Sequence, residues 1–182
     1  MRILISALVL LIVGCTPGAV VSAEAPTADA PFTLTALDVG QGDALLLETP
    51  SARVLVDGGP DATASRHLAA RRIRRLDLVI ATHGDLDHVG GLPDVLGQLK
   101  VGELWLHPSP VGKAAVDRLV EVARTAGVPI RGPLAGAVLR VGGLTLEVLA
   151  PWPALLDGTG EDASNDASIV VRATYGGASV LL

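Results

Sequence analysis

The chain has 182 residues, a length that fits a single domain of roughly 100 to 200 residues. Apolar residues make up 49% of it and aromatic residues 2%, so the core is expected to be aliphatic, as suits α/β layers built from small and branched side chains. The formal net charge of −5 disfavours non-specific binding of nucleic acid through long-range attraction, although a local basic patch could still bind phosphates.

The first residues have the pattern of an export signal. Arg2 precedes an apolar run over residues 3–13, which is shorter than the roughly 20 residues that span a bilayer. The run ends in Ile-Val-Gly-Cys, which resembles the lipobox of bacterial lipoproteins, in which the cysteine, here Cys15, is lipidated. Two other interpretations stay open, a signal-peptidase site at residues 21–23 and a membrane helix over residues 3–21 of a larger protein. All three predict a domain that is exported, either released or tethered to the outer face of the cytoplasmic membrane.

Residues 16–31 are rich in Ala, Thr, Pro and Ser and are expected to form a flexible linker, so the domain covers residues 32–182. Its first part predicts three short antiparallel strands at residues 32–38, 44–48 and 53–57. A helix is predicted over residues 62–75. Five arginines occur in this stretch, at positions 66, 71, 72, 74 and 75, and they form either a solvated helix face or a stripe that binds phosphates.

The second part predicts strands and helices in alternation. A continuous apolar run at residues 78–81 is typical of a buried strand, and helices are predicted over residues 92–99 and 113–126 with a strand at 101–106 between them. Two hairpins follow, each around a Gly-Gly pair, and they join residues 138–140 to 144–150 and 169–174 to 179–182. The sequence therefore predicts an α/β (α+β) fold.

The loop at residues 82–91 carries most of the predicted chemistry. Four side chains that can bind metal lie within six positions directly after the buried strand: His83, Asp85, Asp87 and His88. In extended backbone, residues i and i+2 face the same way, so the first two can converge on one ion, while the other two face a second position. Imidazole and carboxylate suit zinc, manganese or iron(II), and such an ion lowers the pKa of bound water to about 7. The alternative is a polar loop that caps the next helix with Asp87 as the N-cap, which leaves both histidines unexplained.

This loop resembles the HxHxDH signature of the metallo-β-lactamase superfamily, in the HxDxDH form typical of the C-terminal domain of ComEC-type competence proteins. Three further segments are similar to motifs of that group and occur in the same order: Leu-Asp-Val-Gly-Gln-Gly-Asp at residues 37–43, Leu-Val-Asp-Gly-Gly at 55–59 and Ser-Asn-Asp-Ala-Ser at 164–168. The resemblance implies an αββα sandwich with one or two zinc or manganese ions between its two sheets. It also implies hydrolysis of phosphodiesters, often in nucleic acid.

The resemblance assigns roles to individual residues as well. It implies that the metal ligands are His83, Asp85, Asp87 and His88. We predict catalytic roles for Asp87 and Asp57; the latter would orient the ligand loop by hydrogen bonding, or else serve only as a turn residue at a strand end. Side chains that either line the cleft or stabilise turns are Asp38, Gln41, Asp43, Asn165 and Ser168. His67 is expected on a solvated helix face, and His107 either in an ordinary loop or near the cleft.

In that group, a Thr-Gly-Asp whose aspartate bridges both metals follows the last hairpin, and another histidine comes later. Both would lie beyond Leu182, so the chain is expected to be the N-terminal portion of such a domain, either a fragment or a product that cannot complete the site. The predicted function is a metal-dependent hydrolase, related to DNA-uptake proteins, that cleaves DNA through a metal-bound hydroxide. Two alternatives stay open: a lactone, β-lactam or thioester hydrolase of the same fold, and a surface lipoprotein that binds metal or DNA without turnover.

Overall fold

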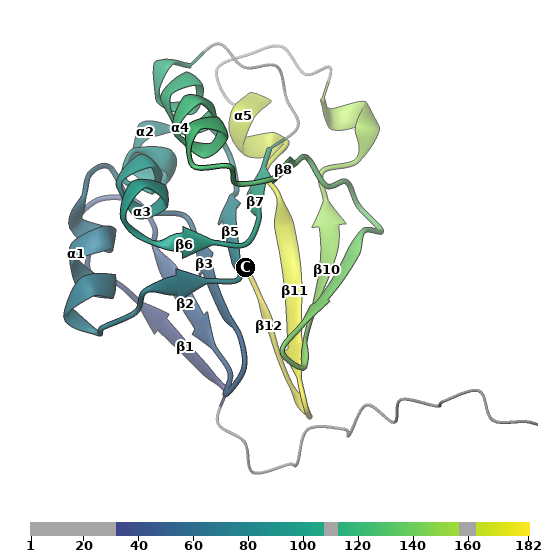
Figure 1. Cartoon of the computed structure of the whole chain (residues 1–182). Coiled ribbons are helices and arrows are strands. Elements are labelled where there is room, and N and C mark those ends of the chain that lie inside the picture. Colours follow the sequence, from purple (N-terminus) through teal and green to yellow (C-terminus); the bar gives the residue numbers. More distant parts are fainter. Residues whose placement is uncertain (1–31, 108–112, 157–162) are drawn as a thin grey trace, which may run out of the picture.

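The computed structural model describes residues 32–107, 113–156 and 163–182, and Figure 1 shows how they are arranged. The predictions for residues 1–31, which include the signal, Cys15 and the linker, lie outside the described residues. None of the described helices is long and apolar enough to cross a membrane.

A six-stranded sheet forms the centre of the molecule. Its strands, in spatial order, are β1 (Thr33–Ala36), β2 (Leu45–Glu48), β3 (Arg53–Val56), β5 (Leu78–Ala81), β7 (Leu104–Leu106) and β8 (Ile130–Arg131). The first three are antiparallel, as predicted, and from β3 onward neighbouring strands are parallel. The carboxyl ends of β3, β5 and β7 therefore meet at one end of the sheet, which is where open α/β sheets bind their ligands.

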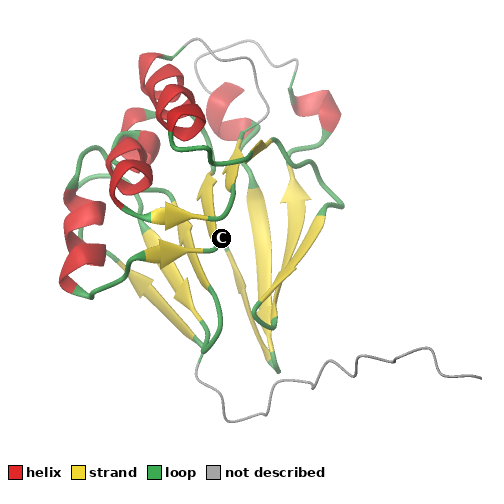
Figure 2. Ribbon diagram, viewed as in Figure 1, coloured by secondary structure: helices red, strands yellow, loops and turns green. Residues whose placement is uncertain are grey.

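Helices cover one face of this sheet, as Figure 2 shows. They are α1 (Thr63–Ala70), α2 (Leu86–Val89), α3 (Leu92–Gln98) and α4 (Ala114–Thr125). In α4 the buried side chains Val116, Leu119 and Ala123 recur at the spacing of one helical face, and they pack into an aliphatic core against the sheet. A separate pair of short parallel strands is formed by β4 (Arg75–Leu76) and β6 (Lys100–Val101).

A second sheet packs on the other face of the first. It contains, in spatial order, β12 (Ala178–Leu181), β11 (Val170–Tyr175), β10 (Leu144–Ala150) and β9 (Val138–Val141), all antiparallel. The chain between β10 and β11 carries a 3-10 helix, η1 (Pro153–Leu155), and α5 (Ala163–Asp166). A second core between the sheets joins Val56 and Ile80 to Leu146 and Val171.

The described residues thus build three layers of the predicted sandwich, a helical layer and two sheets (Figure 1). The outer face of the second sheet is open to solvent among these residues, because Leu181 on that face is 64% exposed. The predicted α/β fold is confirmed.

Two elements differ in extent from the prediction. The helix predicted over residues 62–75 ends at Ala70, because Arg72 adopts a left-handed conformation with φ 60° and the Ile73 N–H bonds back to the Leu68 carbonyl at 3.0 Å. The five arginines therefore do not lie on one helix face, as the first interpretation of them required. The strand predicted at residues 101–106 is divided into β6 and β7, because the Gly102 N–H turns to the Leu76 carbonyl at 3.0 Å.

Candidate metal centre

Asp57 follows β3, and the loop of residues 82–91 follows β5, its neighbour in the sheet. The Asp57 N–H donates to the Ile80 carbonyl and the Gly58 N–H to the His88 carbonyl, both at 2.8 Å, so the two backbones are tied together here. Asp57 adopts a left-handed conformation with φ 57°, which few residues other than glycine adopt. The turn at the end of β3 therefore directs its carboxylate toward the loop.

The Asp57 side chain is buried and accepts three hydrogen bonds from the loop; the residue is 2% exposed. The Thr82 N–H donates to Oδ1 at 2.9 Å, and the Thr82 hydroxyl (2.7 Å) and His88 Nδ1 (2.8 Å) both donate to Oδ2. Bonds of this kind offset the cost of burying a charge. Asp57 thus binds the loop through its side chain, which a turn residue alone need not do.

The same hydrogen bonds fix the proton positions on both histidine rings. The Thr82 hydroxyl has one hydrogen, which it donates to Asp57, so its oxygen accepts from His83 Nδ1 at 3.0 Å. His88 Nδ1 carries the proton that it donates to the Asp57 carboxylate. In each neutral ring Nε2 is then the lone-pair atom, and the two ring centroids lie 4.0 Å apart.

The two histidines differ in their electrostatic surroundings. Burial lowers the pKa of His83, and the neighbouring His88 lowers it further. The hydrogen bond to Asp57 raises the pKa of His88, against the opposing effect of burial. A proton therefore leaves His83 more readily than His88, and His88 is the ring on which a proton competes more strongly with a metal.

Asp85 occupies the N-cap position of α2, although its side chain makes no capping bond, so the alternative that placed Asp87 at the N-cap is wrong. Asp85 Oδ2 lies 3.5 Å from His83 Nε2. Two ligands of a tetrahedral zinc, each at about 2.0 to 2.1 Å, are separated by roughly 3.3 Å, so these two atoms have the spacing of donors to one ion. Asp85 Oδ1 pairs with the Lys113 ammonium, and this hydrogen bond lowers the pKa of Asp85.

Asp87 meets the loop of residues 38–43 by close backbone contact. Gly42 has φ 81°, and a Cβ on it would lie 1.8 Å from the Asp87 carbonyl oxygen. Asp43 Oδ2 lies 4.0 Å from His88 Nδ1. Of the three candidates in this loop, Asp43 is therefore the one that the structure brings to the cluster.

The other two candidates of that loop, Asp38 and Gln41, are exposed. Asp38 Oδ1 accepts from the Gly40 N–H at 3.3 Å, which is the bond of a turn residue. His67 Nε2 donates to the Asp38 carbonyl at 2.8 Å. His67, expected on a solvated face, is instead half-buried and joins α1 to this loop.

The segment before β11 reaches the loop from the second sheet. The Ile169 N–H donates to the Thr82 carbonyl at 2.8 Å, and the Ser168 hydroxyl donates to the Asn165 carbonyl at 2.7 Å. Asn165 and Ser168 thus stabilise the turn that precedes this contact. His107, which follows β7, is buried; burial is the main cause that lowers its pKa, and His83 contributes, so it lies near the cluster.

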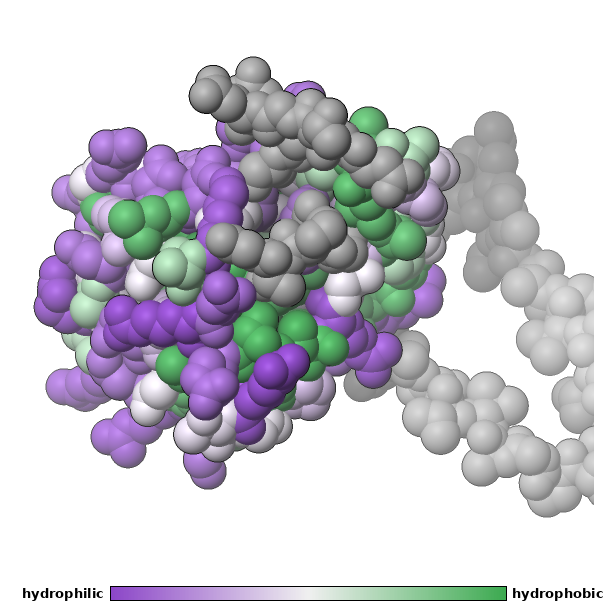
Figure 3. Space-filling view, turned by 90° about the horizontal axis from the view of Figure 1, so that it is seen from above, coloured by the Kyte–Doolittle hydropathy of each residue, from purple (hydrophilic) through white to green (hydrophobic). Residues whose placement is uncertain are grey.

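Within the described ranges, no three His, Cys, Asp or Glu side chains are gathered closely enough to hold a metal ion. His83 and Asp85 nevertheless have the spacing of two ligands, and the hydrogen bonds to Thr82 and Asp57 leave Nε2 of both rings as the donor atom. The donor chemistry therefore fits a divalent metal, with two of the four predicted side chains already spaced for it. Figure 3 views this end of the molecule, where hydrophilic side chains predominate over the helical layer.

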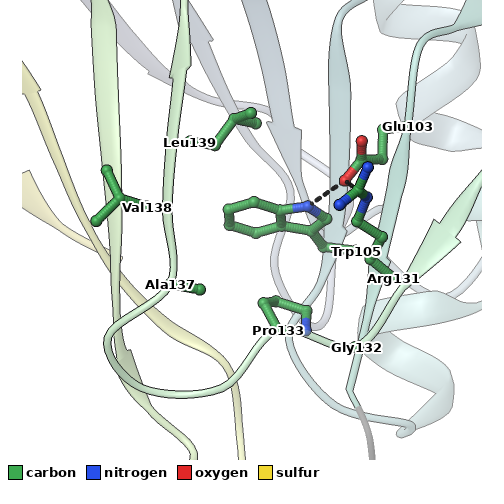
Figure 4. Close-up of a pocket in the computed structure, with 8 residues that line it drawn as sticks. All are labelled: Glu103, Trp105, Arg131, Gly132, Pro133, Ala137, Val138 and Leu139. Atoms are coloured by element: carbon green, nitrogen blue, oxygen red, sulfur yellow. Dashed lines mark hydrogen bonds and ion pairs between the residues drawn. The ribbon is translucent and has the colours of Figure 1, made fainter.

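A cavity of about 340 Å³ lies elsewhere, between β7, β8 and the start of β9 (Figure 4). Its walls include Trp105, Pro133 and Leu139. Glu103 accepts from Trp105 Nε1 at 2.7 Å and pairs with Arg131 Nε at 3.0 Å. None of the predicted site residues lines this cavity, and no sequence motif indicated it.

Comparisons with known proteins agree with this geometry. The profile of the family described as the Metallo-beta-lactamase superfamily matches residues 37–156, which is more than half of the chain. ComE operon protein 3 of Bacillus subtilis (strain 168) is 29% identical over 167 residues, a match that covers 80% of this chain and 21% of that protein. Ribonuclease Z of Bradyrhizobium diazoefficiens is 31% identical over 113 residues, covering 57% of this chain and 38% of that protein. The chain thus spans well under half the length of these two relatives.

Solved structures share the arrangement of strands and helices. A metallo-beta-lactamase of Cronobacter sakazakii with a HARLDQ motif superposes with a TM-score of 0.57 and 18% identity, over 81% of this chain and 57% of that one. The metallo-beta-lactamase fold protein YhfI of Bacillus subtilis gives a TM-score of 0.55 and 18% identity, over 83% of this chain and 61% of that one. At this identity the likeness shows the fold alone.

Proposed function

Because the chain belongs to the metallo-beta-lactamase superfamily, we propose that it is a metal-dependent hydrolase whose site is the loop of residues 82–91. The observation that carries the proposal is the arrangement of the two histidines. His88 Nδ1 bonds to Asp57 and His83 Nδ1 bonds to Thr82, so Nε2 of each ring is left to bind a metal. His83 Nε2 also lies 3.5 Å from Asp85 Oδ2. Outer hydrogen bonds of this kind orient metal-binding histidines.

The side chains that would hold the metal are His83, Asp85, Asp87 and His88. Imidazole and carboxylate together suit zinc or manganese, and four such side chains do not fill two coordination shells. When bound, the metal supplies a coordinated water of lowered pKa and neutralises charge that develops on the attacked group.

Asp57 acts through other groups and is a positioning residue. Its carboxylate holds the proton on His88 Nδ1 and fixes the Thr82 hydroxyl that orients His83. Gly42 packs closely against the Asp87 backbone, and Asp43 borders the same cluster. The chain's own residues therefore orient the donors and limit how far they can move.

We propose a phosphodiester in nucleic acid as the substrate, supported by the relative called ribonuclease Z and by the motifs shared with ComEC-type proteins. A lactone, β-lactam or thioester is the second candidate, supported by the fold shared with metallo-beta-lactamases. Export with lipidation at Cys15, supported by the pattern of residues 2–15, is a separate proposal. A chain that binds metal or DNA without turnover is the remaining alternative.

The test combines zinc or manganese titration with cleavage assays on single-stranded DNA, double-stranded DNA and RNA. We expect stoichiometric metal binding and metal-dependent cleavage, both lost in His83→Ala. Bound metal without cleavage would support the binding protein, and hydrolysis confined to lactones or thioesters would support the second candidate. Purified chain that retains no added metal would contradict a metal site in this loop, and with it both hydrolase assignments.

A further inference from the structure

The candidate site is strongly acidic for one that acts on an anionic polymer. Four carboxylates border the two histidines: Asp43, Asp57, Asp85 and Asp87. Over residues 32–107, 113–156 and 163–182, Lys113 is the one lysine or arginine that forms an ion pair with any of these four. Carboxylates that a metal does not neutralise would repel a phosphodiester, so anion recognition here depends on the cations within reach.

Lys113 is held where it can serve this purpose. It is the N-cap residue of α4, a helix anchored in the core by Val116 and Leu119. Its stem passes over Gly84, where a Cβ would lie 3.4 Å from Lys113 Cδ and 2.9 Å from Val116 Cγ2. Gly84 thus gives the lysine a path to the loop, and α4 fixes the start of that path.

The ammonium group has donors to spare. It has three N–H bonds, and Asp85 Oδ1 accepts one of them. The Lys113 side chain is 49% exposed, so part of it faces solvent. The other Asp85 oxygen, Oδ2, faces His83 Nε2. The Asp85 carboxylate therefore contacts His83 through one oxygen and the partly exposed Lys113 ammonium through the other.

We propose that Lys113 is the residue that selects an anionic substrate, by keeping its bond to Asp85 and donating a second hydrogen bond to a non-bridging phosphodiester oxygen. The inference rests on the function proposed above. Hydrogen bonds between two ionised groups are stronger than those to neutral oxygens. A lactone or thioester presents only a neutral carbonyl before reaction, so Lys113 favours phosphodiesters over these esters.

A matched pair of ligands tests this without turnover. Dimethyl phosphate is a minimal phosphodiester anion, and trimethyl phosphate is its uncharged counterpart of similar shape. Both are titrated into the zinc-saturated full chain and followed by ligand-observed NMR. We expect Lys113→Met to weaken dimethyl phosphate about tenfold and to leave trimethyl phosphate unchanged. Lys113→Arg should retain most of the affinity, and Lys100→Met, at the only other lysine of the chain, should change neither.

Zinc calorimetry on the same variants separates selection from simple support of Asp85. If Lys113 only positioned Asp85, Lys113→Met would weaken zinc and both phosphate esters in parallel, and the proposal would be overturned. Wild-type chain that binds dimethyl phosphate no better than trimethyl phosphate would overturn it as well. If the anion is bound through Lys113 but no nucleic acid is cleaved, the proposed function fails while this inference stands.

Discussion

Asp57 and Glu103 are two carboxylates that flank strands of the same sheet, and each of them binds two other side chains. Asp57 follows β3 and accepts from Thr82 and His88. Glu103 precedes β7 and holds Trp105 and Arg131 at the cavity of Figure 4. Both clusters are therefore a carboxylate with two donor side chains, and the sheet supports each from one of its ends.

The partners decide what each cluster can do. Indole and guanidinium groups only donate, so Trp105 and Arg131 offer no lone pair that could bind a metal. Imidazole has a second nitrogen, so His88 can bond Asp57 through Nδ1 and still bind a metal through Nε2. The Asp57 cluster therefore keeps a lone pair that can bind a metal, and the Glu103 cluster does not.

The largest expected effect comes from removing the Asp57 carboxylate. We expect Asp57→Ala to weaken zinc binding by about 100-fold, since it frees the His88 ring and the Thr82 hydroxyl together. Zinc titration calorimetry measures the change. Glu103→Ala is the matched control, and zinc affinity should stay within about twofold of wild type. Equal losses in the two variants would show that both carboxylates act only through general stability.

Backbone packing around the Asp57 cluster offers a second test. Gly42 and Gly40 both have φ 81°, so alanine is strained at either position. A Cβ at Gly42 would lie 1.8 Å from the Asp87 carbonyl oxygen, whereas one at Gly40 meets nothing within 4 Å. We expect Gly42→Ala to lower the free energy of unfolding by about 2 kcal/mol more than Gly40→Ala. Urea unfolding of both variants measures this difference, and equal values would contradict the close contact.

The histidine cluster should also respond to pH. The Asp57 bond raises the pKa of His88, so the ring is protonated at higher pH than an ordinary histidine with a pKa of about 6.5. A metal requires the neutral ring. As the solution is acidified, zinc affinity should therefore start to fall while the pH is still above about 6.5. Zinc titrations between about pH 5.5 and 8 check this, and a fall confined to lower pH would contradict the raised pKa of His88.

The parts of the fold that the sequence predicts are those set by local pattern. Apolar runs and Gly-Gly turns located β5 and both hairpins of the second sheet. The end of α1 was missed, because a left-handed Arg72 has no sequence signal of the kind that glycine gives. Strand β8 has two residues, which is too short for any periodicity to show.

The candidate site likewise contains residues that the sequence predicts and residues that it does not. His83, Asp85, Asp87 and His88 could be predicted as ligands because they are neighbours in the sequence. Lys113 was missed, because it reaches Asp85 across 28 positions and only the packing of α4 brings it there. Its place at the start of a predicted amphipathic helix was the one available signal. The bond from His67 to Asp38 likewise depends on how α1 docks.

The smallest expected effect concerns Glu103 itself. Glu103→Gln removes the charge that pairs with Arg131, whose side chain is 71% exposed, while an amide oxygen can still accept from Trp105 Nε1. Exposed ion pairs contribute little, so we expect the free energy of unfolding to fall by less than about 1 kcal/mol. Trp105→Phe, which removes the indole N–H and part of the ring from a residue only 4% exposed, should cost more. Thermal unfolding ranks the two variants. A loss in Glu103→Gln that exceeds the loss in Trp105→Phe would show that the Glu103 charge, and not the packing of the indole, maintains this edge of the sheet.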